Sequence, residues 1–204
     1  MDGEGILKVF CALAFLLSLL LVPGRTEACT GIRLKAQDGS CIYARTMEFG
    51  TDLLSCDLAF VPRGQSFRGN APSSGLHWTA RHASVGFSPF GMDLLLDGIN
   101  EKGLACGGFF LPGYAQYQSE DPSGRVPSLS CLDLVSWVLG TCATAEEVRR
   151  RLPDLRVVGA PLAAWNAVPP LHYFVADPTG DVLVVEYLEG KLVLHDGSVG
   201  VITN

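Results

Sequence analysis

Apolar and polar residues alternate along residues 29–36, and this pattern predicts a β-strand because successive strand side chains point to opposite faces. Asp38 and Gly39 are typical of a tight turn, and the strand pattern resumes over 41–49. The two segments therefore predict an antiparallel hairpin. Other apolar runs bounded by turn residues predict strands over 56–63, 92–97 and 103–111.

A helical pattern follows in the second half of the chain. Over 128–140 the apolar residues form one stripe, made of Cys131, Leu132, Val135, Val138 and Leu139. Thr144 and Glu147 form a capping box that starts a second helix, which ends before Pro153. Segments rich in turn residues predict loops over 64–76, 113–127 and 157–170.

The last part of the chain predicts a run of strands, over 171–176, 181–187, 191–195 and 199–203. Strands, then two helices, then further strands indicate an α+β fold built in layers. The final predicted strand stops at Asn204 without a cap or tail. We therefore expect this sequence to be the N-terminal part of a larger domain.

The first 28 residues predict a secretory signal peptide. An apolar run over 9–22 is followed by Pro23 and Gly24, and the small residue Ala28 stands before Cys29. The alternative is an uncleaved membrane anchor, but a spanning helix needs about 20 apolar residues and this run is shorter. We expect a signal peptide over 1–28, a domain over 29–204, secretion or export to the periplasm, and no stable membrane association after cleavage.

Composition and charge exclude several classes of protein. Apolar residues make up 48% of the chain, enough to build a core, so the chain is not disordered. The net charge of −6 argues against nucleic acid as a partner, since such binding needs a basic surface.

The cysteines show no metal-ligand spacing, so we expect no metal and no cofactor. Cys41, Cys56 and Cys142 are candidates for disulfides in an oxidising compartment, whereas Cys106 and Cys131 lie in apolar runs and are expected to be buried.

Cleavage before Cys29 would give one residue two catalytic groups. The thiol is a nucleophile, and the free α-amine has an ordinary pKa of about 7.7–8.0 and can act as its base. Arg45 and Glu48 follow on the partner strand, where an arginine stabilises a thiolate and a carboxylate holds the α-ammonium. The alternatives are a disulfide at Cys29 and a surface pair of Arg45 and Glu48.

Several motifs together resemble one enzyme family. They are CTGIRL at 29–34, ARTMEF at 44–49, DGINEKGLACGG at 97–108, LPGYAQY at 111–117 and GVITN at 200–204. These motifs are similar to the choloylglycine hydrolase family, which includes bile salt hydrolases and penicillin V acylases. The resemblance implies an N-terminal-nucleophile αββα sandwich, incomplete here at its C-terminus, and hydrolysis of linear amide bonds.

The resemblance also implies catalytic roles for individual residues. Cys29 would be the nucleophile, Arg45 would lie beside its thiol, and Glu48 would contact its amine. Asn204 would help to form the oxyanion hole, and an oxyanion donor contributes about 3–4 kcal/mol to transition-state stabilisation.

Phe109 and Phe110 are candidates to line the acyl pocket. Phe110 stands where bile salt hydrolases usually have asparagine, which favours aryl-acetyl or other acyl amides over bile salts. The implied partner is a small N-acyl amide substrate, and the family is compatible with a homo-oligomer.

Other polar residues receive structural interpretations. Asn100 and Gly103 are expected to shape a turn, and His77, His82, His172 and His195 to be surface or strand residues. The alternative to an enzyme is a non-catalytic secreted domain or inactive fragment in which Cys29 forms a disulfide.

The signal-peptide hypothesis predicts that the exported protein begins with Cys29. N-terminal sequencing of secreted material measures this directly. A mature chain that begins at another residue would contradict the hypothesis, because an acylated nitrogen cannot act as the base.

Overall fold

The computed structural model describes residues 29–48, 55–73 and 75–204, so the expected signal peptide lies outside the described residues. Half of the described strands form one large antiparallel sheet of seven. Its order is β13 (Lys191–Asp196), β12 (Val182–Leu188), β11 (Leu171–Ala176), β8 (Ala105–Phe110), β7 (Asp97–Asn100), β6 (Ser84–Pro89) and β3 (Cys56–Val61).

A smaller sheet packs against one face of the large sheet. Its order is β14 (Val201–Thr203), β1 (Thr30–Lys35) and β2 (Cys41–Arg45). The hairpin expected over 29–49 is confirmed by β1 and β2, although residue 49 lies outside the described residues. β14 pairs with the free edge of β1, so the last described strand lies beside the first.

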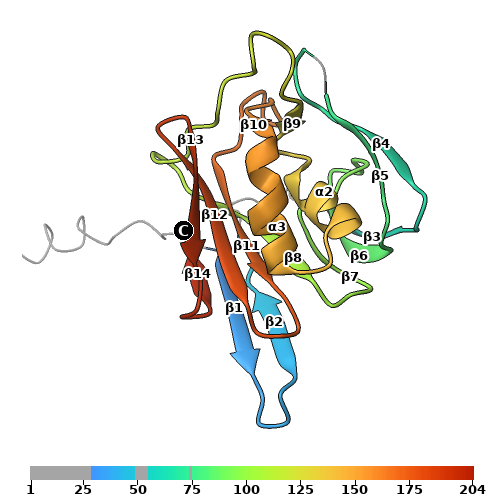
Figure 1. Cartoon of the computed structure of the whole chain (residues 1–204), viewed down its shortest axis with the longest axis vertical. Coiled ribbons are helices and arrows are strands. Elements are labelled where there is room, and N and C mark those ends of the chain that lie inside the picture. The colour runs from blue at the N-terminus through green and yellow to red at the C-terminus, as the bar shows by residue number, and fades with distance from the viewer. Residues whose placement is uncertain (1–28, 49–54, 74) are drawn as a thin grey trace, which may run out of the picture.

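Two helices cover the other face of the large sheet, as Figure 1 shows. They are α2 (Leu134–Thr141) and α3 (Ala145–Arg151), followed by the 3₁₀ turn η1 (Leu152–Asp154). Every residue of α2 is buried, and burial of each large apolar side chain contributes about 1.5–3 kcal/mol to folding. No helix in the described part of the chain is long and apolar enough to cross a membrane.

Alternation along the strands explains why the large sheet has an apolar layer on each face. On β11, Tyr173 and Val175 pack under the helices, whereas Phe174 and Ala176 face the small sheet. The layer between the sheets also contains Cys29. Beyond β2 this face continues over β3, β6 and β7, where apolar side chains are exposed: Leu58, Phe60, Val85, Phe87 and Ile99.

The capping box of the second helix is confirmed. The Thr144 hydroxyl accepts a hydrogen bond from the Glu147 amide, and the Glu147 carboxylate accepts one from the Ala143 amide. These contacts satisfy amide groups that a helix start leaves without partners.

Several short elements differ from the expectation. The expected strand over 92–97 is wrong: Leu94 and Leu95 are buried in a loop, and β7 begins at Asp97. The expected helix over 128–140 begins only at Leu134, because β9 (Ser128–Ser130) forms a parallel pair with β10 (Arg156–Val158). β4 (Ser66–Arg68) and β10 occupy expected loops, and β5 (His77–Thr79) and β6 were not expected. β4, β5 and β10 have three residues each, which is too short for a periodic pattern. β6 buries Ser84 and Ser88 and exposes Val85 and Phe87, the reverse of the usual strand pattern.

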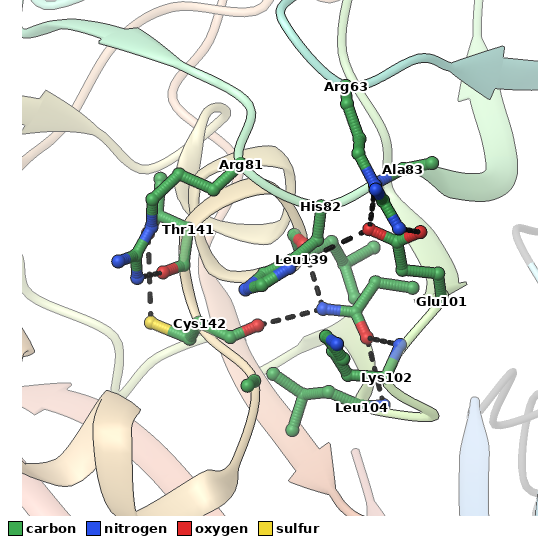
Figure 2. A network of polar contacts seen from close by, with 12 residues as sticks. Arg63, Arg81, His82, Ala83, Glu101, Lys102, Leu104, Leu139, Thr141 and Cys142 are labelled. Carbon is green, nitrogen blue, oxygen red and sulfur yellow. Dashed lines mark hydrogen bonds and ion pairs between the residues drawn. The ribbon is translucent and has the colours of Figure 1, made fainter.

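The four strands expected at the end of the chain are confirmed, the first with the expected bounds and the others with bounds shifted by at most two residues. The expected turn at Asn100 is also confirmed and has a wider role; Figure 2 labels its partners Lys102, Leu104, Leu139 and Cys142. The Asn100 amide donates to the carbonyls of Leu139 and Cys142, at 2.9 and 2.8 Å. Its oxygen accepts from the amides of Lys102 and Leu104, at 3.0 and 3.1 Å. One side chain thus joins the β7–β8 turn to the end of α2.

We expect Asn100→Ala to lower the free energy of unfolding by about 2–4 kcal/mol, because it leaves buried amides and carbonyls without partners. Urea unfolding measures the change. Lys102→Ala is the control in the same turn, with an expected change below about 0.5 kcal/mol at its exposed side chain. Equal unfolding midpoints for the two variants would contradict this role of Asn100.

Candidate active site

Cys29 lies at the start of β1, in the layer between the two sheets. Its side chain is buried, and its thiol lies 3.6 Å from the carbonyl oxygen of Glu48, which accepts a hydrogen bond from it. Thr30 and Thr46 join the segments that carry these residues: the Thr30 amide donates to the Thr46 hydroxyl, and the Thr46 amide to the Thr30 carbonyl. Pairing of β1 with β2 therefore fixes the position of the thiol.

The Glu48 carboxylate does not reach the thiol in this arrangement. The Glu48 residue is exposed, and its backbone carbonyl makes the contact with sulfur. The expected contact between Glu48 and the Cys29 amine is not among the described interactions and stays a prediction.

Arg45 ends β2, and its guanidinium is buried between the sheets. The group lies 4.1 Å from the centre of the Phe109 ring, in a cation–π contact. Its Nη1 donates to the Gly108 carbonyl at 2.8 Å and to the Asp97 carboxylate at 3.2 Å. Its Nη2 is buried and has no hydrogen-bond partner among the described residues. The Phe109 ring that Arg45 contacts belongs to the same buried apolar cluster as Cys29.

Asp97 and Tyr43 belong to this cluster, and the sequence analysis did not select them. The Tyr43 hydroxyl donates to Asp97 Oδ2 at 2.5 Å, the same oxygen that accepts from Arg45. Burial raises the pKa of Asp97, and the hydrogen bonds from Tyr43 and Arg45 oppose this shift. Burial beside the Asp97 charge also raises the pKa of Tyr43 above 10.0, so the phenol remains a donor. Alternation along β2 indicates that Tyr43 shares a face with Arg45, but no local pattern indicates Asp97.

Asn204 lies beside Cys29 because β14 pairs with β1. The backbone amide of Asn204 donates to the backbone carbonyl of Cys29 at 3.3 Å. The side-chain oxygen of Asn204 accepts from the Phe110 amide at 3.1 Å. Since this bond uses the oxygen, the Nδ2 donors of Asn204 remain for another acceptor.

Phe109 and Phe110 point to opposite faces of β8. Phe109 is buried in the core between the sheets, with Phe174 edge-on at 6.5 Å. Phe110 packs edge-on against Trp165 at 5.8 Å, on the helix side of the sheet. There it lines an apolar cavity of about 30 Å³ together with Phe90, Leu132 and Trp165. Of the two phenylalanines, only Phe110 lines this cavity.

The remaining cysteines and the metal-ligating side chains add no further chemistry to this site. All six cysteines in the described part of the chain, including Cys29, are free thiols, so the disulfide candidates Cys41, Cys56 and Cys142 are unpaired. Cys106 and Cys131 are buried, as expected. Within the described ranges, no three His, Cys, Asp or Glu side chains lie together in a way that would hold a metal ion.

A second polar cluster lies on the same face of the large sheet. Glu186 accepts from two histidines, with His172 Nδ1 at 3.2 Å and His195 Nε2 at 3.0 Å. The His172 ring packs edge-on against Phe109, with centroids 6.3 Å apart. Burial lowers the pKa of His172 below 6.5, although Glu186 opposes this shift. His172 is therefore a buried strand histidine beside the site.

Comparison with known proteins supports an enzymatic interpretation. Residues 29–204 match the family model of the linear amide C–N hydrolases, choloylglycine hydrolase family. A bile salt hydrolase/transferase of Clostridium perfringens is 32% identical over 178 residues, which cover 86% of this chain and 53% of that protein. A penicillin V acylase of Pectobacterium atrosepticum is 31% identical over 202 residues, or 95% of this chain and 53% of the relative.

Solved structures give the same result for the fold. The penicillin V acylase of Agrobacterium tumefaciens superposes with a TM-score of 0.73 and 32% identity, over 85% of this chain and 51% of that chain. The expected sandwich is thereby confirmed. The chain spans about half the length of the relatives that it matches.

We expect the free energy of unfolding to decrease as the pH is lowered, partly because of His172. Burial lowers the pKa of His172 below 6.5, so well above pH 6.5 the residue is neutral in both the folded and the unfolded state. In that range its protonation does not change the free energy of unfolding. As the pH falls from 6.5 toward the lower folded-state pKa, the unfolded state takes up the proton first, and the free energy of unfolding falls.

Urea unfolding at about pH 7 and about pH 5 tests this sign. His172→Gln should lose less stability between the two conditions than the wild type, whatever its stability at pH 7. His77→Gln is the control at an exposed histidine and should follow the wild type. An equal pH dependence in His172→Gln and the wild type would show that His172 does not contribute.

Proposed function

We propose, from the premise that this chain belongs to the linear amide C–N hydrolases of the choloylglycine hydrolase family, that it hydrolyses a small N-acyl amide with Cys29 as nucleophile. The observation that carries the proposal is the convergence of two distant segments, residues 45–48 and Asn204, on Cys29. Arg45 contacts the Phe109 ring, which belongs to the same buried cluster as Cys29. The Glu48 carbonyl contacts the thiol, and Asn204 binds the Cys29 backbone. The family match also begins at Cys29, which supports removal of residues 1–28.

The proposed reaction needs only one residue for both nucleophile and base. The Cys29 thiol transfers its proton to its own α-amine, and Sγ attacks the amide carbonyl carbon. The tetrahedral intermediate expels the amine, which takes that proton, and a thioester remains. Water then attacks the thioester carbonyl carbon and gives a proton to the α-amine. The carbon–sulfur bond breaks, the acid is released, and the α-ammonium returns the proton to the Cys29 sulfur.

Two side-chain donors are proposed to bind the carbonyl oxygen as negative charge develops on it. The Nδ2 group of Asn204 is one, because its side-chain oxygen is held by the Phe110 amide. Nη2 of Arg45 is the other, because it is buried without a partner among the described residues. Donors held in place before the reaction stabilise the transition state without a cost of reorganisation.

The acyl group of the substrate is proposed to pass the end of β8, where the Phe110 amide binds Asn204, and to enter the apolar cavity beside Phe110 on the helix face of the large sheet. Its aromatic lining by Phe90, Phe110 and Trp165 favours an aryl-acetyl or other apolar acyl chain. A cavity of about 30 Å³ cannot hold such a group as it stands, so the side chains around Phe110 must move apart when substrate binds. The penicillin V acylase and bile salt hydrolase relatives suggest these two substrate classes for the test.

The alternative of a non-catalytic domain with a disulfide at Cys29 receives no support from the described residues. Cys29 is a free thiol, and its side chain is only 1% exposed. In either interpretation the protein is proposed to be secreted or periplasmic, since residues 9–22 form the apolar run expected of a signal peptide.

We expect Cys29→Ser to lower kcat about 10²- to 10⁴-fold in protein processed to residue 29, because a hydroxyl is a weaker nucleophile near neutral pH. Release of free amine from phenoxyacetyl and glycine-conjugated bile acid amides measures activity. Cys41→Ser is the control: it changes a half-buried thiol elsewhere on β2 and should retain full activity. Protein that keeps Ala28 before Cys29 should be as inactive as Cys29→Ser, and full activity in that form would contradict the mechanism.

A further inference from the structure

Arg45 is held by two of its three nitrogens, and this leaves the third in a defined position. Its Nε donates to the Thr46 carbonyl at 3.2 Å. Its Nη1 donates to the Gly108 carbonyl and to Asp97. A guanidinium is planar, so fixing Nε and Nη1 also fixes the direction of Nη2. Nη2 is the nitrogen without a partner among the described residues.

Asp97 supplies the charge that makes this arrangement stable. The side chains of Arg45 and Asp97 are 7% and 8% exposed, and among the described residues each is the one ion-pair partner of the other. Loss of one partner of such a pair leaves an uncompensated buried charge. The two residues come from different sheets, Arg45 from β2 and Asp97 from β7.

Tyr43 holds the carboxylate from the other side. It lies two residues before Arg45 and therefore on the same face of β2. Its hydroxyl reaches the same oxygen, Oδ2, that accepts from Arg45. The Asp97 carboxylate is thus fixed by two donors from one strand, and its position sets that of the guanidinium.

Gly107 provides the space for this contact. A Cβ atom at this position would lie 2.2 Å from Asp97 Oδ2 and 2.4 Å from the Tyr43 hydroxyl. No carbon atom fits at those distances, so any other residue would displace the carboxylate or the phenol. The absence of a side chain at 107 is therefore required by the polar contact itself.

From this geometry we propose that Asp97 and Tyr43 are positioning residues for the proposed amide hydrolysis, which orient Arg45 so that its Nη2 faces the reacting carbonyl. The inference rests on the proposed function for the reaction, but the orientation of Arg45 stands on contacts between side chains alone. Asp97 and Tyr43 act through Arg45 and do not touch the substrate.

Two substitutions test the role in catalysis. Asp97→Asn and Tyr43→Phe should each lower kcat about 10- to 100-fold, the worth of a hydrogen bond to a charged group, with little change in KM. Asp57→Asn, at an exposed aspartate of β3, should leave kcat unchanged. A change in KM alone, or kcat equal to that of Asp57→Asn, would overturn the proposal.

Chemical rescue separates positioning from a general structural role. Arg45→Ala should regain part of its activity when guanidinium is added at millimolar concentration, because Asp97 can bind the free cation. Arg45→Ala combined with Asp97→Asn should not be rescued. Equal rescue of both proteins would show that Asp97 does not place the cation.

Nuclear magnetic resonance of protein labelled with ¹⁵N-arginine tests the orientation without any substrate. A locked Arg45 should give separate signals for its two terminal nitrogens, and these should merge in Asp97→Asn through faster rotation. Gly107→Ala should do the same without removing a polar group, whereas Gly140→Ala, with its nearest neighbour at 3.5 Å, should not.

The activity measurements and the resonance measurements separate failure of the proposed function from failure of the positioning role. Separate signals that persist in Asp97→Asn would overturn the positioning role even if the wild-type protein is an active amidase. An inactive wild-type protein with signals that merge in Asp97→Asn would instead refute the proposed function and retain the orientation of Arg45 by Asp97.

Discussion

The buried positive charge of Arg45 is the constraint around which the rest of the site is arranged. A guanidinium in an apolar layer needs a nearby carboxylate and acceptors for its remaining donors. Here the carboxylate, Asp97, belongs to the opposite sheet, and so does the Gly108 carbonyl. The two sheets can satisfy Arg45 only at one relative position, because hydrogen bonds tolerate little change in distance. The same contact that compensates the charge therefore fixes how the sheets register on one another.

The site is assembled from parts of the chain that are far apart in sequence. β1 carries Cys29 and is paired on one side by β2 and on the other by β14. This pairing brings Arg45 and Asn204 to the two sides of the same strand, and β8 and β7 supply the surface beneath. The position of the thiol thus depends on long-range strand pairing, which is cooperative.

Much of this arrangement could be predicted from the sequence, for identifiable reasons. The β1–β2 hairpin and the strands from Leu171 onward have local alternation and turn residues at their ends. Thr144 and Glu147 marked a helix start through side chains that cap it. The nucleophile candidate followed from the expected cleavage point. In each case the physical cause lies within a few residues of the element that it determines.

What could not be predicted depends on contacts between distant residues. β9 forms because β10 lies beside it, and Leu94 and Leu95 are apolar because a loop is packed into the core. The partnership of Asp97 with Tyr43 and Arg45 has no local signature, since a carboxylate before a turn is usually exposed. Phe109 and Phe110 both stay candidates for the acyl pocket. The sheet register, which no local pattern indicates, places Phe109 between the sheets and Phe110 on the helix face.

The close approach of β1 to Phe109 has a mechanical consequence. A Cβ on Gly31 would lie 2.5 Å from the Phe109 ring, so backbone and ring are already in direct contact. Because the Phe109 ring is rigid and in contact with the backbone at Gly31, it restricts movement of β1 toward the large sheet. The Cys29 thiol, two residues earlier, is restricted with it. The apolar cavity beside Trp165 lies on the opposite face of the large sheet, so side chains can rearrange there without moving the Cys29 thiol.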